Sequence, residues 1–409
     1  METSFVEAYL LDWANLLLRW LHVIVAIAWI GSSFYFVFLD NNLLAPTADD
    51  LKKKGVDGAM WAVHGGGFYN PQKYMVAPQG GVMDSKLHWF YWESYSTWLS
   101  GFALFCVLYL WNASAFLIDR QVLDWSPAMA GFAALGFLAG FWFIYDAICR
   151  VFGFRPNGER IVAALLIVVV ALASWLACHL FSGRAAFLII GAMLATAMSA
   201  NVFFWIIPGQ RKVVAAMTQG QAYDAEALSI HGKRGKQRSV HNTYFTLPVL
   251  IAMLSNHYSF LTSHPQRWLV LVLLMLAGAL IRQFFVQRHG WHHGRAANPW
   301  PFAAVGVVLL LGLMAWMKPA VTPQGSAAAG QKADYAAIRP ILEQRCYQCH
   351  GEAVQMKNLR LDNQAQVEQF AQPIYQQVVV TRVMPLSNAT QITDAERALI
   401  GQWFNSRTP

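Results

Sequence analysis

The most constraining feature of this 409-residue chain is a series of apolar segments long enough to cross a lipid bilayer. A helix needs about 20 mostly apolar residues to span the hydrocarbon core, because unpaired backbone groups are costly there. Such segments predict an all-α, polytopic helical bundle with about eight transmembrane helices. The predicted spans are residues 13–39, 91–111, 127–149, 161–181, 185–207, 241–261, 267–285 and 299–317.

Composition divides the chain into two parts. Hydrophobic residues make up 56% of the chain and charged residues only 13%, which is outside the range of ordinary soluble domains. The apolar runs end near residue 317, so we expect a membrane domain over residues 1–318 and a separate domain over residues 333–409. Residues 319–332 are rich in Pro, Gly, Ala and Ser, which is typical of a flexible linker.

The basic residues predict the orientation of the spans. A net charge of +8 would suggest nucleic acid for a soluble protein, but here most Lys and Arg lie in short loops, where they set topology. We therefore expect no nucleic-acid partner. The loops that carry most of this charge should be cytoplasmic, and both termini should lie on the opposite side. The basic residues of these loops are Lys52, Lys53, Lys54, Lys73, Lys86, Arg150, Arg155, Arg160, Arg211, Lys212, Lys233, Arg234, Lys236, Arg238, Arg288 and Arg295.

The N-terminal segment is acidic before its first apolar run and lacks a small-residue cleavage site. Both features are typical of a retained first helix rather than of a signal peptide that is removed.

The sequence Cys346-Tyr347-Gln348-Cys349-His350 has the spacing of a c-type haem attachment site. Two thiols would bond to the porphyrin, and the adjacent His350 would ligate the iron. The alternatives are a zinc site or a redox pair, but neither requires a His directly after the second Cys. Attachment of such a haem takes place outside the cytoplasm, which agrees with the orientation from the basic loops. The other cysteines, Cys106, Cys149 and Cys178, are typical of buried packing.

A second iron ligand is expected downstream of His350. Met384 is followed by Pro385, a pairing that resembles the Met-Pro of small class I cytochromes c, whereas Met356 is interpreted as a packing or surface residue. Thr393 and Glu396 predict a capping box that opens a closing helix. Residues 333–409 are therefore predicted to form a small class I cytochrome c domain with haem c.

Several polar residues fall within the predicted spans, where they are costly and indicate function. These residues are His22, Asp146, His179, His257 and the region of Asn201. The segment around His22 resembles the first helix of several bacterial membrane proteins that bind a b-type haem, so His22 and His257 are candidate ligands of a haem b. The alternative is that these histidines hydrogen-bond across helices.

The first long cytoplasmic loop contains the sequence HGGGFYNPQKY. Glycines allow the backbone to approach a ligand closely, aromatic rings can stack on a flat heterocycle, and a lysine can bind negative charge. The candidate substrate-binding residues are Gly66, Gly67, Phe68, Tyr69 and Lys73. Glycine-rich loops and interfacial aromatic residues are also common beside membranes without such a role. A second polar segment, RHGWHHGR, carries His289, His292 and His293 and is interpreted as a solvated turn rather than as a metal site.

Together these features resemble the family of integral-membrane urate oxidases, bacterial proteins in which an eight-helix urate oxidase domain is fused to a C-terminal cytochrome c. The resemblance covers essentially the whole chain. It is carried by WLHVIVAIAWIGSSFYFVFLDNNL, HGGGFYNPQKY, HWFYWESYSTWLSG, HNTYFTLPVLIAMLSNH and CYQCH with its later Met-Pro.

The resemblance implies a cytochrome c-linked enzyme of purine degradation in the bacterial inner membrane. It would oxidise urate to 5-hydroxyisourate and pass the electrons to haem c. A soluble cytochrome c or a terminal oxidase would then take them onward.

A cytoplasmic urate site would lie between the glycine-rich loop and the start of the sixth predicted span. There His241, Asn242 and Tyr244 could bind the purine or move its protons, and His64 or Glu93 could serve as the general base. Such a site and a periplasmic haem would be separated by about 30 Å of hydrocarbon. Either the urate site lies deep in the membrane or a carrier such as haem b lies between them.

Two other functions remain open from the sequence. One is a membrane module that relays electrons, for example from quinol, to cytochrome c without a urate site. The other is a transporter whose haem domain senses redox state, although no convincing internal repeat supports it.

Overall fold

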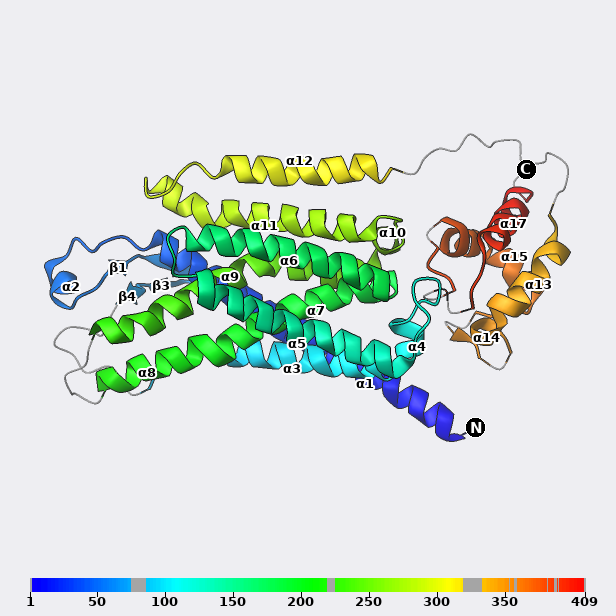
Figure 1. Cartoon of the computed structure of the whole chain (residues 1–409), viewed down its shortest axis with the longest axis horizontal. Coiled ribbons are helices and arrows are strands. Elements are labelled where there is room, and N and C mark those ends of the chain that lie inside the picture. The colour runs from blue at the N-terminus through cyan, green and yellow to red at the C-terminus, as the bar shows by residue number, and fades with distance from the viewer. Residues whose placement is uncertain are drawn as a thin grey trace.

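The computed structural model describes residues 2–74, 86–218, 225–318 and 333–407, except residues 353, 357, 358, 381, 386, 387 and 389. A bundle of long helices lies beside a smaller group of C-terminal helices (Figure 1). The predicted linker, residues 319–332, lies outside the described residues.

Each predicted span coincides with a helix of the bundle or with a short series of helices. The residue ranges are α1 (Glu2–Asn42), α3 (Trp92–Phe105) with the π-helical turn η1 (Cys106–Leu110), α5 (Pro127–Phe152), α6 (Gly158–Leu180), α7 (Gly183–Asn201) with the π-helical turn η2 (Val202–Ile206) and α8 (Ile207–Thr218), α9 (Ala225–Leu254) with η3 (Ser255–His257) and α10 (Ser259–Thr262), α11 (Arg267–His292) and α12 (Trp300–Trp316).

Five helical stretches of the described chain are long and apolar enough to cross a membrane, as expected of a membrane protein. The other three predicted spans lie on helices that do not meet this standard. Trp300–Trp316 is apolar but shorter, α3 has only 14 residues before η1, and α9 carries Lys, Arg and Gln in its first half. The five stretches are Tyr9–Asn42, Pro127–Phe152, Gly158–Leu180, Gly183–Thr218 and Arg267–His292.

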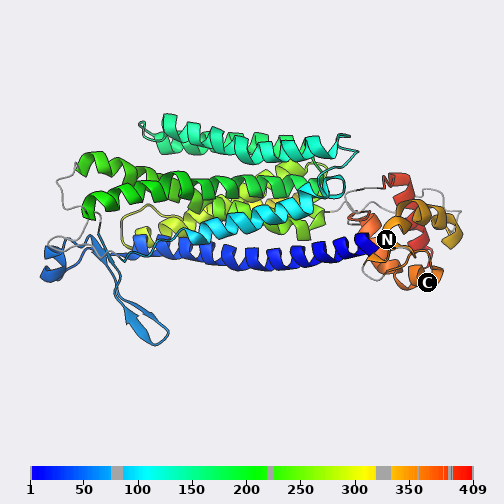
Figure 2. The same cartoon turned by 90° about the horizontal axis from the view of Figure 1, so that it is seen from below.

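The two ends of the bundle differ. Two small antiparallel sheets and α2 (Asp49–Lys53) lie at one end, which we call the hairpin end (Figure 1). The N-terminus, α4 (Ala113–Phe116) and α10 lie at the other end, which we call the N-terminal end. In the sheets, β1 (Gly58–Ala59) pairs with β4 (Gln72–Lys73), and β2 (Ala62–His64) pairs with β3 (Gly67–Tyr69). The β2–β3 hairpin projects away from the helices (Figure 2).

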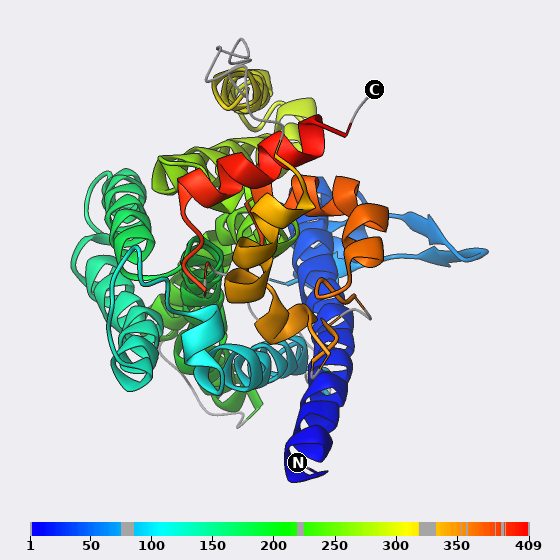
Figure 3. The same ribbon diagram turned by 90° about the vertical axis from the view of Figure 1, so that its right-hand side faces the viewer.

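The core of the bundle forms around α7. Its small residues allow neighbouring backbones to approach closely, as is common in membrane bundles. A Cβ atom at Gly191 would lie 2.9 Å from the Cβ of Ala252 on α9, so only glycine fits there without a shift. Figure 3 shows α1 and α12 at the outer edge of the bundle. The fully buried side chains of α7 include Ala185, Ala186, Phe187, Ile189, Ile190 and Ala197.

The C-terminal helices enclose a separate core. Its fully buried residues include Ile338, Leu342, Val367 and Ile400. The helices are α13 (Tyr335–Arg345), α14 (Tyr347–His350), α15 (Gln364–Gln369), α16 (Ala371–Ile374), the π-helical turn η5 (Tyr375–Val380) and α17 (Asp394–Asn405).

The predicted capping box at the start of α17 is confirmed. The hydroxyl of Thr393 accepts from the Glu396 backbone N–H at 3.2 Å, and the Glu396 carboxylate accepts from the Thr393 N–H at 2.6 Å. Burial alone would raise the pKa of Glu396, but hydrogen bonds from Thr393 and Arg345 outweigh it and lower that pKa. The same carboxylate therefore ties α17 to α13.

One expected turn is replaced by helix. The first five residues of the RHGWHHGR segment are helical, because α11 ends at His292 with His293 as its C-cap. The ring of His289 packs edge-on against Phe38 at 5.4 Å, and this contact with α1 favours continuation of the helix. Within the described residues, no group of three or more His, Cys, Asp or Glu side chains could hold a metal ion.

Two glycines of α12 test how closely this helix packs. At Gly306 a Cβ atom would lie 2.9 Å from the Ile281 side chain of α11, whereas at Gly312 it would meet nothing within 4 Å. Overpacking costs about 1–3 kcal/mol. We expect Gly306→Val to lower the thermal unfolding temperature in detergent and Gly312→Val to leave it nearly unchanged. Equal effects of the two variants would show that α12 does not pack on α11 in this register.

Candidate functional site

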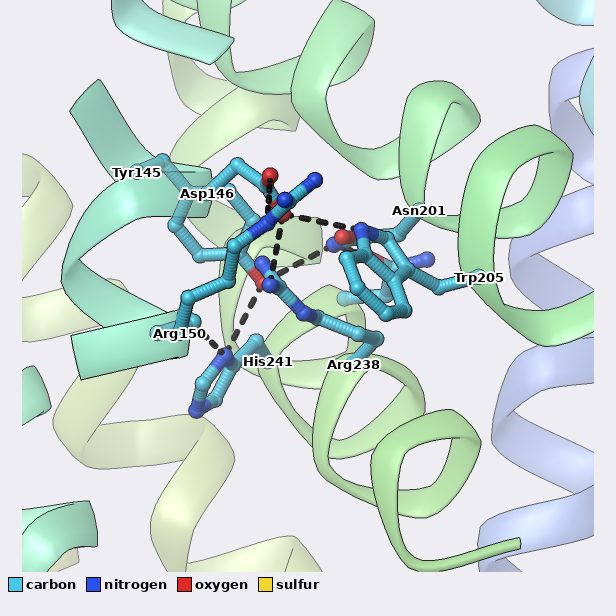
Figure 4. Close-up of polar contacts among 9 residues, drawn as sticks. Tyr145, Asp146, Arg150, Asn201, Trp205, Arg238 and His241 are labelled. Carbon is cyan, nitrogen blue, oxygen red and sulfur yellow. Dashed lines mark hydrogen bonds and ion pairs between the residues drawn. The ribbon is translucent and has the colours of Figure 1, made fainter. Parts of the chain in front are cut away.

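A network of buried polar side chains lies where α5, α7 and α9 meet (Figure 4). Tyr145 and Asn201 are fully buried, and His241 and Asn242 are nearly so. The Asn201 amide donates to the Tyr145 hydroxyl at 2.9 Å and to Asn242 Oδ1 at 2.8 Å. The Asn242 amide in turn donates to the Met198 carbonyl at 3.0 Å. Side chains from three helices that are distant in sequence thus form one connected group.

An ion cluster adjoins this network. The Asp146 carboxylate accepts from Arg238 at 2.7 Å and from the indole N–H of Trp205 at 2.8 Å. Its second oxygen lies 2.6 Å from the Nε atom of Arg150. The Arg238 guanidinium also lies 4.8 Å from the centre of the Tyr145 ring. Asp146 is therefore the shared partner of two arginines and a tryptophan.

Local helix geometry brings these groups together. Arg238, His241 and Asn242 occupy positions i, i+3 and i+4 of α9, a spacing that directs side chains toward neighbouring positions on the helix surface. On the neighbouring helix, Asn201 is the last residue of α7, and the π-helical turn η2 with Trp205 follows directly. Such turns insert an extra residue, change side-chain directions and occur frequently at functional sites.

A phenol, an imidazole and a carboxylate form a chain from this network to the surface. The Tyr145 hydroxyl lies 2.9 Å from His241 Nδ1, and His241 Nε2 lies 3.2 Å from Glu159 Oε2. Because the Tyr145 oxygen accepts from Asn201, its own hydrogen is free to point at Nδ1. The Glu159 side chain is 60% exposed, whereas Tyr145 is fully buried. This series of hydrogen bonds from Tyr145 through His241 to Glu159 can therefore carry a proton between the interior and the hairpin end.

Gln237 holds the outer member of this chain in place. Its amide donates to Glu159 Oε1 at 2.7 Å and to the Gly153 carbonyl at 3.1 Å. A Cβ atom at Gly153 would lie 2.6 Å from that amide nitrogen, so the glycine makes room for the contact.

Two atoms of the network lack partners. Asn201 Oδ1 and Arg238 Nη1 are buried without a hydrogen bond among the described residues. Most buried polar atoms are hydrogen-bonded, so unsatisfied ones require an explanation. An acceptor and a charged donor, both beside Tyr145, can bind a ligand that carries donor and acceptor groups.

The structure brings together only some of the predicted catalytic residues. His241 and Asn242 belong to the buried network. Tyr244 instead donates to Gln283 on α11. His64 is exposed on β2, and Glu93 lies in the first turn of α3 with a buried oxygen that has no described partner. Roles for Tyr244, His64 and Glu93 stay predictions.

No hydrogen bond or ion pair among the described residues joins the predicted substrate-binding residues directly to the network. Gly65 and Gly66 adopt positive φ angles of 59° and 80° and form the tip of the β2–β3 hairpin. Phe68 is 76% exposed there, and Gly67 and Tyr69 belong to the same strand. Lys73 lies on β4, where its ammonium is 2.7 Å from Asp40. Binding of substrate by this hairpin and by Lys73 stays a prediction.

The residues at the predicted c-type site fit a haem. Cys346, Cys349 and His350 lie on one helical turn, and the backbone N–H groups of Cys349 and His350 donate to the Cys346 carbonyl at 3.1 and 2.9 Å. Both thiols are free, and burial raises the pKa of the Cys346 thiol to about 12. His350 Nδ1 is buried and has no hydrogen-bond partner among the described residues, so no such bond prevents the ring from binding iron.

The loop that carries the predicted second ligand is held by α17. The Arg397 guanidinium is buried and donates to the Met384 carbonyl at 2.8 Å and also to the Val378 carbonyl. Met384 packs against the C-terminal core, whereas Met356 is 59% exposed. Arg397 therefore positions the Met384 segment, and the packing of Met384 suits an axial ligand better than the exposure of Met356.

The candidate haem b ligands differ in environment. His22 Nδ1 lies 3.1 Å from both the Thr97 carbonyl and the Ser100 hydroxyl, and a Cβ atom at Gly101 would lie 2.8 Å from the ring. A hydrogen bond at Nδ1 is typical of an oriented metal-ligating histidine. It agrees equally well with the alternative that His22 only forms hydrogen bonds between helices. His257 is exposed, and in the described chain no hydrogen bond or ring contact joins it to His22. This ligand pair stays a prediction.

Sequence reasoning missed Tyr145, Glu159 and Arg238 as members of the site. Arg238 was assigned to a cytoplasmic loop because it follows other basic residues, but it is almost fully buried on α9. Asp146 and Asn201 were singled out as polar residues within spans. A search for compensating charges near Asp146 could have identified Arg238.

Comparison with known protein families gives one match. The family described as "Urate oxidase N-terminal" matches residues 8–318, which include the buried network and the bundle apart from the first residues of α1. No curated protein and no solved structure matches the chain.

The Asp146–Arg238 pair has a testable energetic role. Replacing Asp146 by alanine would bury the Arg238 charge without its partner, a change that costs about 3–5 kcal/mol. The control is Asp124→Ala, which removes an exposed pair with Arg120 at 3.6 Å and should change stability by less than about 1 kcal/mol. Thermal unfolding in detergent measures both variants. A similar small effect of both would contradict the assignment of Asp146 as the essential counter-charge.

Proposed function

The chain belongs to the urate oxidase N-terminal family, and we propose that it oxidises urate to 5-hydroxyisourate within the helical bundle. The observation that carries this proposal is the chain from Tyr145 through His241 to Glu159 beside two unpartnered polar atoms. It supplies what a hydroxylating oxidation needs, namely groups that bind a polar heterocycle and groups that remove protons.

The balanced reaction defines the task of these residues. The urate anion and one water give the 5-hydroxyisourate anion, two protons and two electrons. Arg238 Nη1 and Asn201 Oδ1 would orient urate through its carbonyl and N–H groups. Tyr145 and His241 would accept a proton from urate or from the attacking water and pass it to Glu159. Positioned groups of this kind contribute roughly 10²- to 10⁴-fold to such reactions.

The electrons leave through the C-terminal domain in this proposal. A haem held by Cys346, Cys349, His350 and Met384 would accept electrons one at a time at a potential raised by Met ligation. A soluble cytochrome c or a terminal oxidase would take them onward. The free thiols, the uncommitted His350 ring and the packing of Met384 support this arrangement.

The proposed topology has eight crossings of a bacterial inner membrane, with α9, α12 and the series α3–η1 as the three crossings beyond the five long apolar stretches. The hairpin end is cytoplasmic, because Lys and Arg concentrate in its loops. Both termini are then periplasmic. Glu159 would release protons to the cytoplasmic side, where urate is also produced.

The depth of the network bears on electron transfer. A site on the exposed hairpin would place urate about 30 Å of hydrocarbon away from the periplasmic haem. The complete burial of Tyr145 and Asn201 favours a substrate position inside the bundle instead. No step of the proposed reaction is assigned to His22 or His257.

Anaerobic addition of urate to the purified, haem-loaded protein tests the proposed function. We expect the absorption bands of reduced haem to appear, because urate would be the electron donor and no oxygen is required. Reduction by a quinol but not by urate would contradict the proposal and favour a membrane relay to cytochrome c.

The proton chain makes a separate prediction about rates. Tyr145→Phe and His241→Asn should lower the rate of urate-dependent haem reduction by roughly 10²-fold or more, because they remove groups that transfer protons. Glu159→Gln should have a smaller effect, since water can reach this exposed end. His231→Gln on the same helix is the control and should react at the original rate. Stopped-flow absorption measures the rates, and an unchanged rate in His241→Asn would contradict the proton chain.

A further inference from the structure

Arg282 is a buried charge without a counter-charge in the part of the chain that the structure describes. It lies on α11 and is only 4% exposed. Its Nε and Nη2 atoms have no hydrogen-bond partner, and no carboxylate of the described chain lies within ion-pair distance of it. An isolated guanidinium inside a bundle is costly and by default marks a functional site.

Other buried or half-buried arginines of the bundle have a partner for the charge or for the guanidinium N–H groups, although Arg238 Nη1 is also unpartnered. Arg238 pairs with Asp146 at 2.7 Å. Arg184 donates to the Asn256 carbonyl at 3.1 Å, and Arg267 donates to the Cys178 carbonyl at 2.8 Å. Arg282 differs from these residues because neither its charge nor two of its nitrogens are compensated within the described chain.

The surroundings of Arg282 leave its in-plane N–H groups for a ligand. One face of the guanidinium is covered by Phe34 of α1, with the ring centre 3.8 Å from the guanidinium carbon. The neighbouring residue Gln283 is occupied by the Tyr244 hydroxyl of α9. A planar fork backed by an aromatic ring is suited to a planar anion with adjacent acceptor atoms.

We propose that Arg282 binds the negatively charged edge of the urate anion. Urate is flat, and its charge is spread over adjacent ring nitrogen and carbonyl oxygen atoms, which match the free Nε and Nη2 donors. This inference rests on the proposed function and names the residue that supplies the counter-charge of the substrate. A bound anion would also remove the cost of burying Arg282 alone.

The proposed position lies near the proton chain along α9. Tyr244, whose hydroxyl contacts the residue next to Arg282, follows His241 by three residues. Residues three apart in a helix are neighbours on its surface and are separated by less than one turn. Tyr244 therefore brings the neighbour of Arg282 within one helical turn of His241, so that Arg282 can supply the counter-charge of the substrate while His241 moves its protons.

Binding of radiolabelled urate to the full-length, haem-loaded protein tests this inference by anaerobic equilibrium dialysis. Arg282→Gln should weaken binding by roughly 10- to 100-fold, the range expected for loss of a charged hydrogen bond. Arg282→Lys should fall between Arg282→Gln and the unaltered protein, because it keeps the charge but not the planar fork. The control is Arg288→Gln, which removes another arginine of α11 that lies over a phenylalanine ring and should leave binding unchanged.

Thermal unfolding without urate separates a binding role from a structural one. If Arg282 serves a ligand, Arg282→Gln should unfold at the same temperature as the unaltered protein or higher, because an uncompensated buried charge is removed. Unchanged urate affinity in Arg282→Gln, or weaker affinity together with a lower unfolding temperature, would overturn the inference. If Arg282→Gln does not fold, Arg282→Lys decides, and full urate affinity in that variant would overturn it.

The two proposals can fail separately. Haem reduction by urate in the unaltered protein, together with normal urate affinity in both Arg282 variants, would refute only the role of Arg282. Absence of both urate binding and urate-dependent reduction in the unaltered protein would refute the proposed function as well.

Discussion

The position of α9 depends on the ion pair between Arg238 and Asp146. The first half of α9 is rich in Lys, Arg and Gln, and Lys233, Arg234 and Lys236 are exposed. Gln237 and Arg238, in contrast, are buried where the helix enters the bundle between α7 and α11. Asp146 on α5 compensates the buried Arg238, and Trp205 donates to the same carboxylate. Without these partners, α9 would carry an unpaired charge into the bundle, which is among the most costly changes a protein can undergo. With them, the helix holds His241 and Asn242 in fixed positions.

This arrangement separates the paths of protons and electrons in the proposed reaction. Protons would move from Tyr145 through His241 to Glu159 at the hairpin end. Electrons would leave toward the C-terminal domain, whose own core packs independently of the bundle core. The membrane domain would therefore bind and deprotonate the substrate, and the C-terminal domain would remove the electrons. The free donors of Arg282 fit this division, since a substrate anion would complete a site that the chain leaves uncompensated.

Much of the fold follows from the sequence, because a helix that crosses the hydrocarbon core needs about 20 mostly apolar residues. The segments around residues 127–149 and 161–181 were predicted as helices for this reason, and the capping box at Thr393 was readable from two residues. The polar half of α9 was harder, since basic residues beside a span resemble loop charge. Arg238 became recognisable as buried only once α5 placed Asp146 against it.

The residues of the candidate site could also be predicted only in part from the sequence. The cost of polar groups in a membrane singled out Asp146 and Asn201 from sequence alone. Tyr145 could not be recognised, because a tyrosine near the end of an apolar run resembles an interfacial anchor. The glycine-rich loop drew attention through its composition, but its hairpin is exposed and projects away from the helices (Figure 2). Which helices face each other depends on side-chain packing that no local pattern encodes.

A full-length variant without the attachment thiols separates the roles proposed for the membrane domain and the C-terminal domain. Cys346→Ser with Cys349→Ser removes the covalent anchors of the haem and leaves the bundle unaltered. Anaerobic dialysis with radiolabelled urate, followed by recovery of the bound label, should then show urate bound as tightly as in the haem-loaded protein and recovered unchanged. Loss of binding, or conversion of urate at the original rate, would contradict the account.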